Sequence, residues 1–249
     1  MKVVVIINSR KDLSVLNYVL VLMKKLYPTA HLFIYDIASR QKKSHSELES
    51  ISPVMHFTII PIKGNRHIIK SVLMKIKLPY IIFISTYIQS QIIGMKKSYG
   101  WAHKIQCPLI AIPSENTPGN FPEKIITPID LHSLASNTIK KIKEASSLLG
   151  LVIEFVHISQ MGETNESLYD QKEKSFFKQL DHIFKNYKTQ YRFSKTSDVK
   201  KGILEYLQKK DNCIITIPRS RHNKFVELFY THIVQDAEKS IRNSPFLLL

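Results

Sequence analysis

The sequence predicts an α/β protein made of two similar halves, each a parallel sheet flanked by helices. Segments 2–26 and 124–148 resemble each other, since each has a short β-branched run, a polar turn and a helical pattern. Short apolar runs then alternate with helical patterns along the whole chain. The runs are continuously apolar, which is typical of parallel strands that are covered on both faces.

In the first half, each expected strand is an apolar run of strand length, and helical patterns separate most of these runs. A polar segment at 38–56 leaves room for at most a shortened helix. A further helix is expected around 66–77, and a last one before the final strand. The strands are expected at 3–7, 31–37, 57–62, 80–85 and 108–112. The first helix is marked by apolar residues at helical spacing: Val15, Leu16, Val19, Leu20, Met23 and Leu26.

The second half repeats this order. Its first helix follows a plausible N-cap, Ser133, and shows a stripe of Ile139, Ile142, Ala145 and Leu149. Unlike the first half, it has a clear helix between its second and third strands, and another helix around 198–210. The strands are expected at 125–129, 151–158, 189–193, 213–218 and 245–249. The buried stripe of the additional helix is expected to be Leu168, Phe176, Phe177, Leu180, Ile183 and Phe184.

Composition and charge narrow the class of protein. The chain has 249 residues, a formal net charge of +16 and 44% hydrophobic residues, which excludes a disordered tail. Lysines number 29 against 7 arginines, whereas specific nucleic-acid recognition relies more on arginine. The apolar runs are too short to span a membrane, and two cysteines cannot build a disulfide framework. We therefore expect a cytoplasmic protein whose basic charge is a compositional feature.

An opening motif and two similar closing motifs carry a resemblance to a known family. The second half opens with TPIDLHS at 127–133 and closes with NSPFLLL at 243–249, and the first half closes with QCPLIAIP at 106–113. In these features the chain resembles the universal stress protein family, as two tandem domains at 1–115 and 124–249 joined by a linker at 116–123. The resemblance implies two Rossmann-like domains, each with a five-stranded parallel sheet. It also implies that the final strands pair antiparallel, as an intrachain pseudo-dimer.

The resemblance further implies where a nucleotide would bind. Family members that bind ATP carry G-x-x-G, nine residues and G-[ST] after the fourth strand, where glycine backbones approach phosphate. Here Pro218 and Arg221 stand at the first two glycines, and Thr231 stands at the last. In the first half Gly94 is the one glycine kept, and Asn8 replaces the acid of the first strand. The degenerate loops imply that ATP binding is lost and that no cofactor is bound.

Few residues of the nucleotide-binding pattern are kept in this chain. Asp130 keeps the position of the acid that follows the first strand in ATP binders. The segment 218–224 is the densest basic stretch and offers side chains to an anion in place of a glycine backbone. A residual site for a nucleotide, ATP or AMP, or for an anion would use Asp130, Arg219, Arg221 and Thr231.

The sequence does not support a catalytic, metal-binding or thiol-based function. No G-x-S-x-G elbow, Walker loop or paired metal-binding spacing of histidine occurs, so neither an enzyme nor a metal protein is expected. Cys107 and Cys213 are expected to be small buried residues and not reactive thiols.

The function that this pattern favours is a non-enzymatic, stress-related binding or scaffold protein whose protein partner is unknown. Whether the chain also forms a homodimer stays open. One alternative is an adenine-nucleotide sensor that uses Asp130. Another is a polyanion binder that uses the net charge of +11 on residues 1–122, where nucleic acid would bind only nonspecifically.

Overall fold

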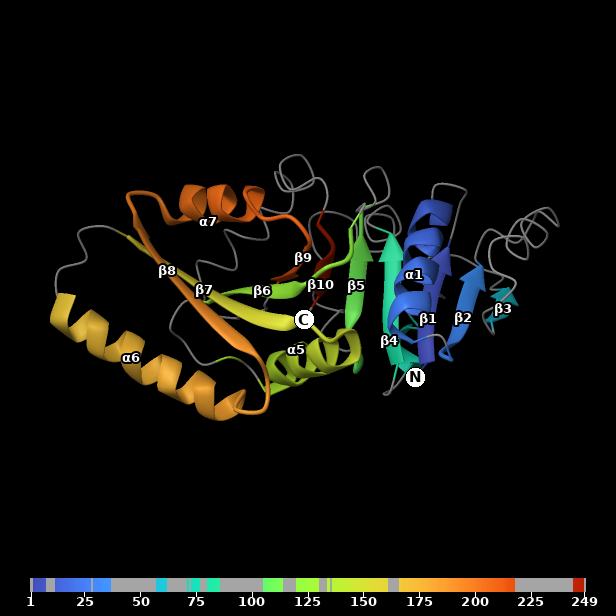
Figure 1. The fold of residues 1–249 in the computed structure, drawn as a ribbon, viewed down its shortest axis with the longest axis horizontal. Helices are drawn as coiled ribbons and strands as arrows, with labels where there is room; N and C mark the ends of the chain where they lie inside the picture. Colours follow the sequence, from blue (N-terminus) through green and yellow to red (C-terminus); the bar gives the residue numbers. More distant parts are fainter. Residues whose placement is uncertain are drawn as a thin grey trace. The chain divides into compact units, whose positions relative to one another are not determined.

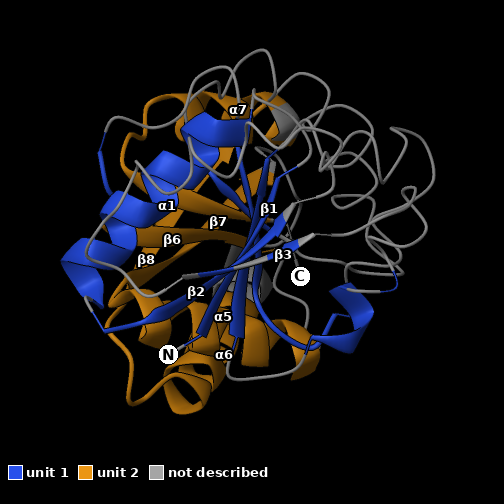
Figure 2. Ribbon diagram, turned by 90° about the vertical axis from the view of Figure 1, so that its right-hand side faces the viewer, with its two compact units in different colours: residues 1–121, 245–248 blue, residues 122–244, 249 orange. Residues whose placement is uncertain are grey.

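The chain divides into two compact units in the computed structural model (Figure 2). Unit 1 comprises Met1–Phe121 with Pro245–Leu248, and unit 2 comprises Pro122–Ser244 with Leu249. The C-terminal strand thus groups with the first unit, although the sequence places it at the end of the second half. The structure describes residues 2–7, 12–27, 29–36, 57–61, 71, 73–76, 80–85, 105–113, 120–129, 134, 136–160, 166–217 and 244–248.

Unit 1 is a mostly parallel sheet. Its parallel strands lie in the order β3-β2-β1-β4-β5, and the helix α1 (Leu13–Leu26) contacts β1 and β4. The last strand, β10 (Phe246–Leu248), pairs antiparallel with β5, with Phe246 opposite Ala111 and Leu247 opposite Ile110. The antiparallel pairing expected for the final strands is confirmed. The parallel strands are β1 (Lys2–Ile7), β2 (His31–Asp36), β3 (Phe57–Pro61), β4 (Tyr80–Ser85) and β5 (Leu109–Ile112).

Unit 2 has four described parallel strands in the order β9-β6-β7-β8. Figure 1 shows α5 and α6 on one side of these strands and α7 on the other. The strands are β6 (Lys124–Ile129), β7 (Val152–Gln160), β8 (Thr189–Thr196) and β9 (Cys213–Ile217). The helices are α5 (Ser136–Leu149), α6 (Glu166–Ile183) and α7 (Val199–Gln208).

Both units therefore use the same order, in which the first strand lies between the second and the fourth. The α/β class, the parallel pairing and the position of every expected strand are confirmed, although β8 extends three residues beyond the expected end at 193. Because connections leave the first strand and the fourth strand in opposite directions, the sheet of unit 1 has a switch point between β1 and β4. Unit 2 has the corresponding point between β6 and β9.

Each core forms where an apolar strand meets the apolar stripe of a helix. In unit 1 all of β1 after Lys2 is buried, beneath an α1 stripe that includes Val15, Leu16 and Met23. In unit 2 the Phe155 ring packs edge-on against Phe184 at 5.1 Å between ring centroids and stacks on Tyr191 at 5.8 Å. These ring contacts attach the α6 side of the unit to β7 and β8.

Two glycines fit specific places in unit 2. Gly150 follows α5 with a φ of 66°, the left-handed conformation in which a glycine ends a helix without strain. Gly202 lies inside α7, where a Cβ would come within 2.8 Å of Thr196 Cγ2 and 3.2 Å of Ile158 Cγ2. A glycine there lets α7 lie close against β7 and β8.

The buried face of α5 differs from the sequence-based stripe. Ile142, Ala145 and Leu149 are buried as expected, but Ile139 is only half-buried. Lys141 is instead fully buried, although helical periodicity of apolar residues assigns it to the polar face. The expected α6 stripe is confirmed at Phe176, Leu180 and Phe184, whereas Phe177 and Ile183 are half-buried.

Some expected elements fall outside the described residues: the segment 38–56, the last helix of each half, and the N-cap Ser133. Of the helix expected around 66–77, residues 73–75 are helical, with Leu73 buried. Among the helices of the described ranges, none has the length and apolar character that a membrane span requires.

The antiparallel pair of β10 and β5 gives a stability prediction. Leu247 is fully buried, so Leu247→Ala removes apolar contacts and leaves a cavity, at a cost of about 2–5 kcal/mol in the free energy of unfolding. Urea denaturation measures this change. The control is Val21→Ala on α1, where the side chain is 56% exposed and the expected change is below about 0.5 kcal/mol. Equal effects of the two substitutions would contradict a buried, paired β10.

Candidate functional site

The carboxyl ends of the parallel strands at the switch points are where open α/β sheets bind ligands. In unit 2 this edge is formed by β6, which ends at Ile129, and β9, which ends at Ile217. Asp130 and Pro218 follow these strands directly in the sequence. The four residues expected to form a residual nucleotide or anion site, Asp130, Arg219, Arg221 and Thr231, all lie outside the described residues.

The described residues place several buried polar side chains near this edge. Thr127 on β6 and Thr216 on β9 are both fully buried, and His157 on β7 is 5% exposed. Because Ile126 pairs with Ile215, the next residues, Thr127 and Thr216, lie on the same face of neighbouring strands. Neither hydroxyl oxygen has a hydrogen-bond partner in the part of the chain that the structure describes.

His157 is held in place on β7, opposite Ile129 at the end of β6. Its Nδ1 lies 2.9 Å from the carbonyl oxygen of Ile129, the last residue of β6. A carbonyl only accepts, so Nδ1 carries the proton and donates it. The contact joins the carboxyl end of β6 to β7 and fixes the backbone just before Asp130 in the sequence.

Unit 1 has a related arrangement at its own switch point. Ser85, the last residue of β4, and Asp12, which precedes α1, are both fully buried. Asp12 is the N-cap residue of α1, but its side chain makes no capping hydrogen bond to the helix. The family pattern places the acid of the first strand at Asn8, and the burial of Asp12 was not predictable, because its position after a polar turn gives no sign of burial.

The chemistry that these edges offer is limited. Among the described residues, the last two of β6, β7 and β9 include no lysine, arginine or glycine, so these strand ends supply neither a phosphate-binding cation nor a glycine backbone, and the cation at the end of β8, Lys195, lies on the outermost strand. No group of three or more His, Cys, Asp or Glu side chains suited to a metal ion occurs in the described part of the chain.

Both thiols are buried, as the sequence led us to expect. The Sγ of Cys213 lies 3.7 Å from Ser244 Oγ, and burial raises the pKa of this thiol to about 11. Such a thiol stays protonated at neutral pH and is a poor nucleophile.

A buried ion pair lies at the opposite edge, where the strands of unit 2 begin. The carboxylate of Glu154 on β7 is fully buried and accepts a hydrogen bond from Lys124 Nζ at 2.7 Å. Its other oxygen accepts a hydrogen bond from the hydroxyl of Tyr206 on α7. Burial raises the pKa of Glu154, but the hydrogen bonds from Lys124 and Tyr206 and the charges of Lys124 and Lys210 together hold it below its usual value. This network joins β6, β7 and α7.

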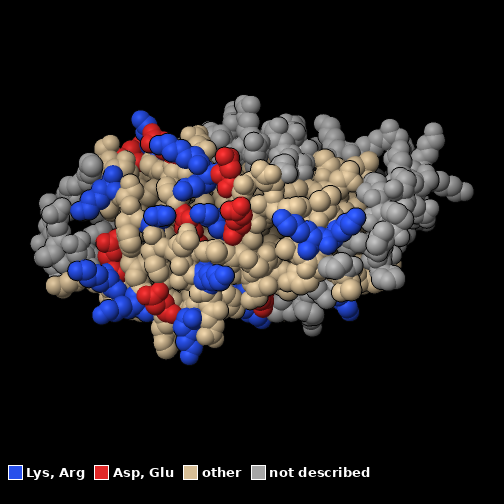
Figure 3. Space-filling model, in the orientation of Figure 1, with Lys and Arg blue, Asp and Glu red and all other residues tan. Residues whose placement is uncertain are grey.

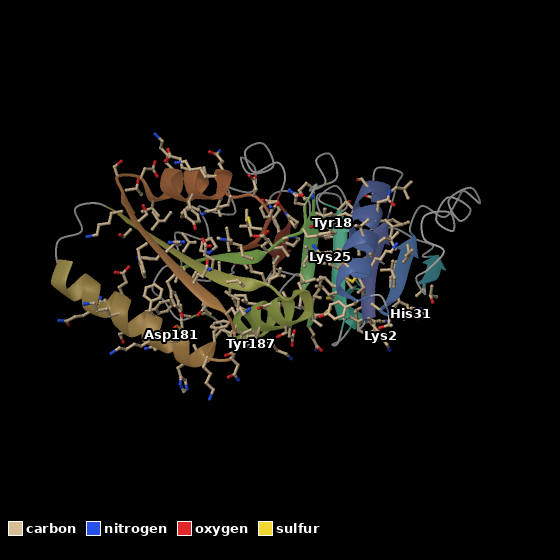
Figure 4. All side chains as sticks on the ribbon, viewed as in Figure 1. Lys2, Tyr18, Lys25, His31, Asp181 and Tyr187 are labelled. Carbon is tan, nitrogen blue, oxygen red and sulfur yellow. The ribbon has the colours of Figure 1, made fainter. Side chains whose placement is uncertain are left out.

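Unit 1 uses the equivalent positions differently. Lys2 is the first residue of β1, and Lys124 is the first residue of β6. On the neighbouring strand, Phe33 of unit 1 occupies the position that Glu154 occupies in unit 2, two residues after the residue paired with the lysine. Lys2 has no carboxylate there, and its Nζ lies 5.4 Å from the centre of the Tyr80 ring. Figure 4 labels Lys2 and, at the start of β2, His31, which stacks on Phe33 at 4.6 Å. The repeat keeps the lysine and changes its partner from a charge to aromatic rings.

The comparisons with known proteins agree with this fold. No protein-family model and no curated protein matches the sequence. A Pseudomonas aeruginosa UCBPP-PA14 protein assigned to the universal stress proteins is similar in structure, with a TM-score of 0.56 and 14% identity, over 99% of this chain and 91% of that one. A universal stress protein of Archaeoglobus fulgidus DSM 4304 gives 0.56 and 11%, over 98% and 97%. A functionally unknown protein of P. aeruginosa PAO1 gives 0.56 and 12%, over 99% and 91%. The chain therefore shares its fold with universal stress proteins.

The Lys124–Glu154 pair gives a second prediction. Lys124→Met leaves the buried Glu154 carboxylate without its cation, so the free energy of unfolding at neutral pH should fall by about 3–5 kcal/mol. Adding Glu154→Gln removes the uncompensated charge and should restore part of the loss. Lys201→Met is the matched control, because its pair with Glu205 is 74% and 52% exposed and should contribute less than about 1 kcal/mol. Urea denaturation compares the variants.

The pH dependence has a definite sign. The pKa of Glu154 is lower in the folded protein than in the unfolded chain, so its contribution to stability is complete above the unfolded value and is lost as pH falls through the folded value. Denaturation midpoints measured on acidification should fall less steeply for Glu154→Gln than for the wild type. An identical acid dependence would show that Glu154 is not the titrating group.

Proposed function

We propose that the chain is a tandem universal-stress-type protein that is not an enzyme, has lost ATP binding and acts by binding a protein partner. The proposal places two domains on one chain and an intrachain pseudo-dimer between them. The fold that both units share with universal stress proteins supports the family assignment. The common strand order and the antiparallel pairing of β5 with β10 support the tandem form.

The observation that carries the loss of ATP binding is the end of β9. This strand ends at Ile217, so the connection that would present backbone N–H groups to phosphate begins, in the sequence, with a proline. Pro218 has no N–H, and Arg221 carries a Cβ where ATP binders have a glycine. The described strand ends nearby add no cation that would compensate, and His157 is already bonded to the Ile129 carbonyl.

Thermal unfolding with nucleotides tests the proposal. A ligand stabilises the folded state by RT ln(1 + [L]/Kd), so about 1 mM ATP with magnesium should raise the melting temperature by less than about 1 °C if its Kd lies above about 10 mM. AMP should behave in the same way. A concentration-dependent rise that disappears in Asp130→Ala would contradict the proposal and favour the adenine-nucleotide sensor. Asp211→Ala, a substitution of an exposed acid between α7 and β9, is the control for the loss of one carboxylate.

A further inference from the structure

We propose that β8, at the edge of unit 2, binds an extended acidic segment of a partner protein as an added strand. This inference rests on the proposed binding role, because it names the class of partner. The two can fail separately, since binding of ATP would leave the β8 edge unchanged, and absence of peptide binding would leave the loss of ATP binding intact.

The backbone of β8 has one edge turned away from its neighbour. In unit 2 the strand lies at the end of the sheet, and β7 is the strand with which the structure pairs it. Ile153 N–H donates to the carbonyl of Lys188, so residues 188, 190, 192, 194 and 196 direct their backbone groups toward β7. The N–H and C=O groups of Tyr191 and Phe193 therefore point the other way, toward the position of an additional strand.

An apolar contact surface accompanies this edge. Phe193 is 52% exposed, and its ring packs edge-on against Phe177 of α6 at 4.6 Å between centroids. Tyr191 is held beside it, because its hydroxyl donates to Asp181 at 2.5 Å, with Asp181 labelled on α6 in Figure 4. An added strand would direct every second side chain to the face of the sheet that carries Phe193, where α6 and Tyr191 already form a fixed contact surface.

Charge selects the kind of segment. Residues 185–196 contain four basic residues, Lys185, Lys188, Arg192 and Lys195, and no acidic residue. All four are exposed. Figure 3 shows basic side chains over the α6 and β8 region, with isolated acidic side chains between them. An acidic strand is therefore attracted along the whole edge, and a basic one is repelled.

The same charge argues against a second copy of this chain as the occupant. Two copies of segment 185–196 side by side would bring eight like charges together, in a protein whose net charge is already +16. Lysine on an edge strand is a common protection against such self-pairing. Lysine does not oppose pairing with a strand that carries glutamate or aspartate. The β8 edge therefore disfavours a second copy of β8 and accepts an acidic partner.

Fluorescently labelled synthetic peptides of about nine residues test the proposal by anisotropy with the full-length protein. The first peptide alternates glutamate with valine, the second has lysine in place of glutamate, and the third is the acidic peptide with a central proline. The acidic peptide should bind, and the lysine peptide should not. The proline peptide should bind about two- to tenfold more weakly, because it loses at least one backbone hydrogen bond.

Two substitutions at one position separate the backbone from the side chain. Phe193→Ala and Phe193→Pro both remove the exposed ring, but only the proline also removes the N–H that points away from β7. Edge strands tolerate proline there, because the hydrogen bonds to β7 use the neighbouring residues. Phe193→Pro should therefore bind the acidic peptide more weakly than Phe193→Ala, by about two- to tenfold. Circular dichroism and the melting temperature show whether each variant is folded.

Charge reversal supplies an independent measurement that keeps Phe193. Arg192→Glu with Lys188→Glu should weaken binding of the acidic peptide about tenfold or more. The matched control is Lys24→Glu with Lys75→Glu, two exposed positions of unit 1 that change the net charge by the same amount. The control should keep the affinity of the wild type.

Several results would overturn the proposal. These are no binding of the acidic peptide, equal binding of the acidic and lysine peptides, equal binding of the acidic and proline peptides, or equal effects of the two charge reversals. A competition experiment with a single-stranded oligonucleotide of about twelve nucleotides distinguishes a strand-docking site from a polyanion site. If the oligonucleotide displaced the acidic peptide from wild type at physiological salt, the edge would be a polyanion site and not a strand-docking site.

Discussion

Burial of one central strand on both faces is the constraint on which each unit depends. From Val3 to Ile7, β1 is at most 4% exposed, and β6 is buried from Ile125 to Ile129. Such a strand has neighbours on both edges and helices above and below, so a polar side chain buried in it costs free energy unless it finds a hydrogen-bond partner. The position of helices on both faces of unit 2 follows directly (Figure 1). Chemistry is then confined to the strand ends and to the outermost strand.

The two units meet this constraint with different side chains. Where β7 carries Glu154 inside an apolar run, β2 carries Phe33, and the lysine at the start of the first strand contacts a carboxylate in one unit and an aromatic ring in the other. A buried ion pair is seldom retained for its net energy, because desolvation offsets most of the attraction. Its directional hydrogen bonds do, however, fix α7 against β6 and β7 in one arrangement.

Much of this fold follows from periodicity. The central strands were predictable, because a run such as VVVII or YIIFIS that is buried on both faces has no polar alternative, whereas the end of the largely exposed β8 was expected three residues too early. The pairing of β5 with β10 was also predictable, since both are apolar strands that end a half. The buried Lys141 was not, because helical periodicity locates a stripe but not the flanking positions that neighbouring elements cover. Glu154 was visible as a lone charge in a buried run, but its partner Tyr206 lies 52 residues away and is found only in the folded chain.

The candidate site, like the fold, was predictable from the sequence only in part. The resemblance places Pro218 and Arg221 where ATP binders have glycines, and the proposed loss of ATP binding rests on these residue identities without any geometry. The sequence does not indicate that His157 is buried and donates to the Ile129 carbonyl, because a histidine in a strand is equally consistent with an exposed ring. The described strand ends of unit 2 thus offer few groups to a small ligand, whereas the outermost strand directs backbone N–H and C=O groups away from its neighbour. In unit 2 this strand is β8, which is basic and carries an exposed aromatic ring, so the same open sheet that limits small-ligand chemistry leaves a surface suited to a peptide.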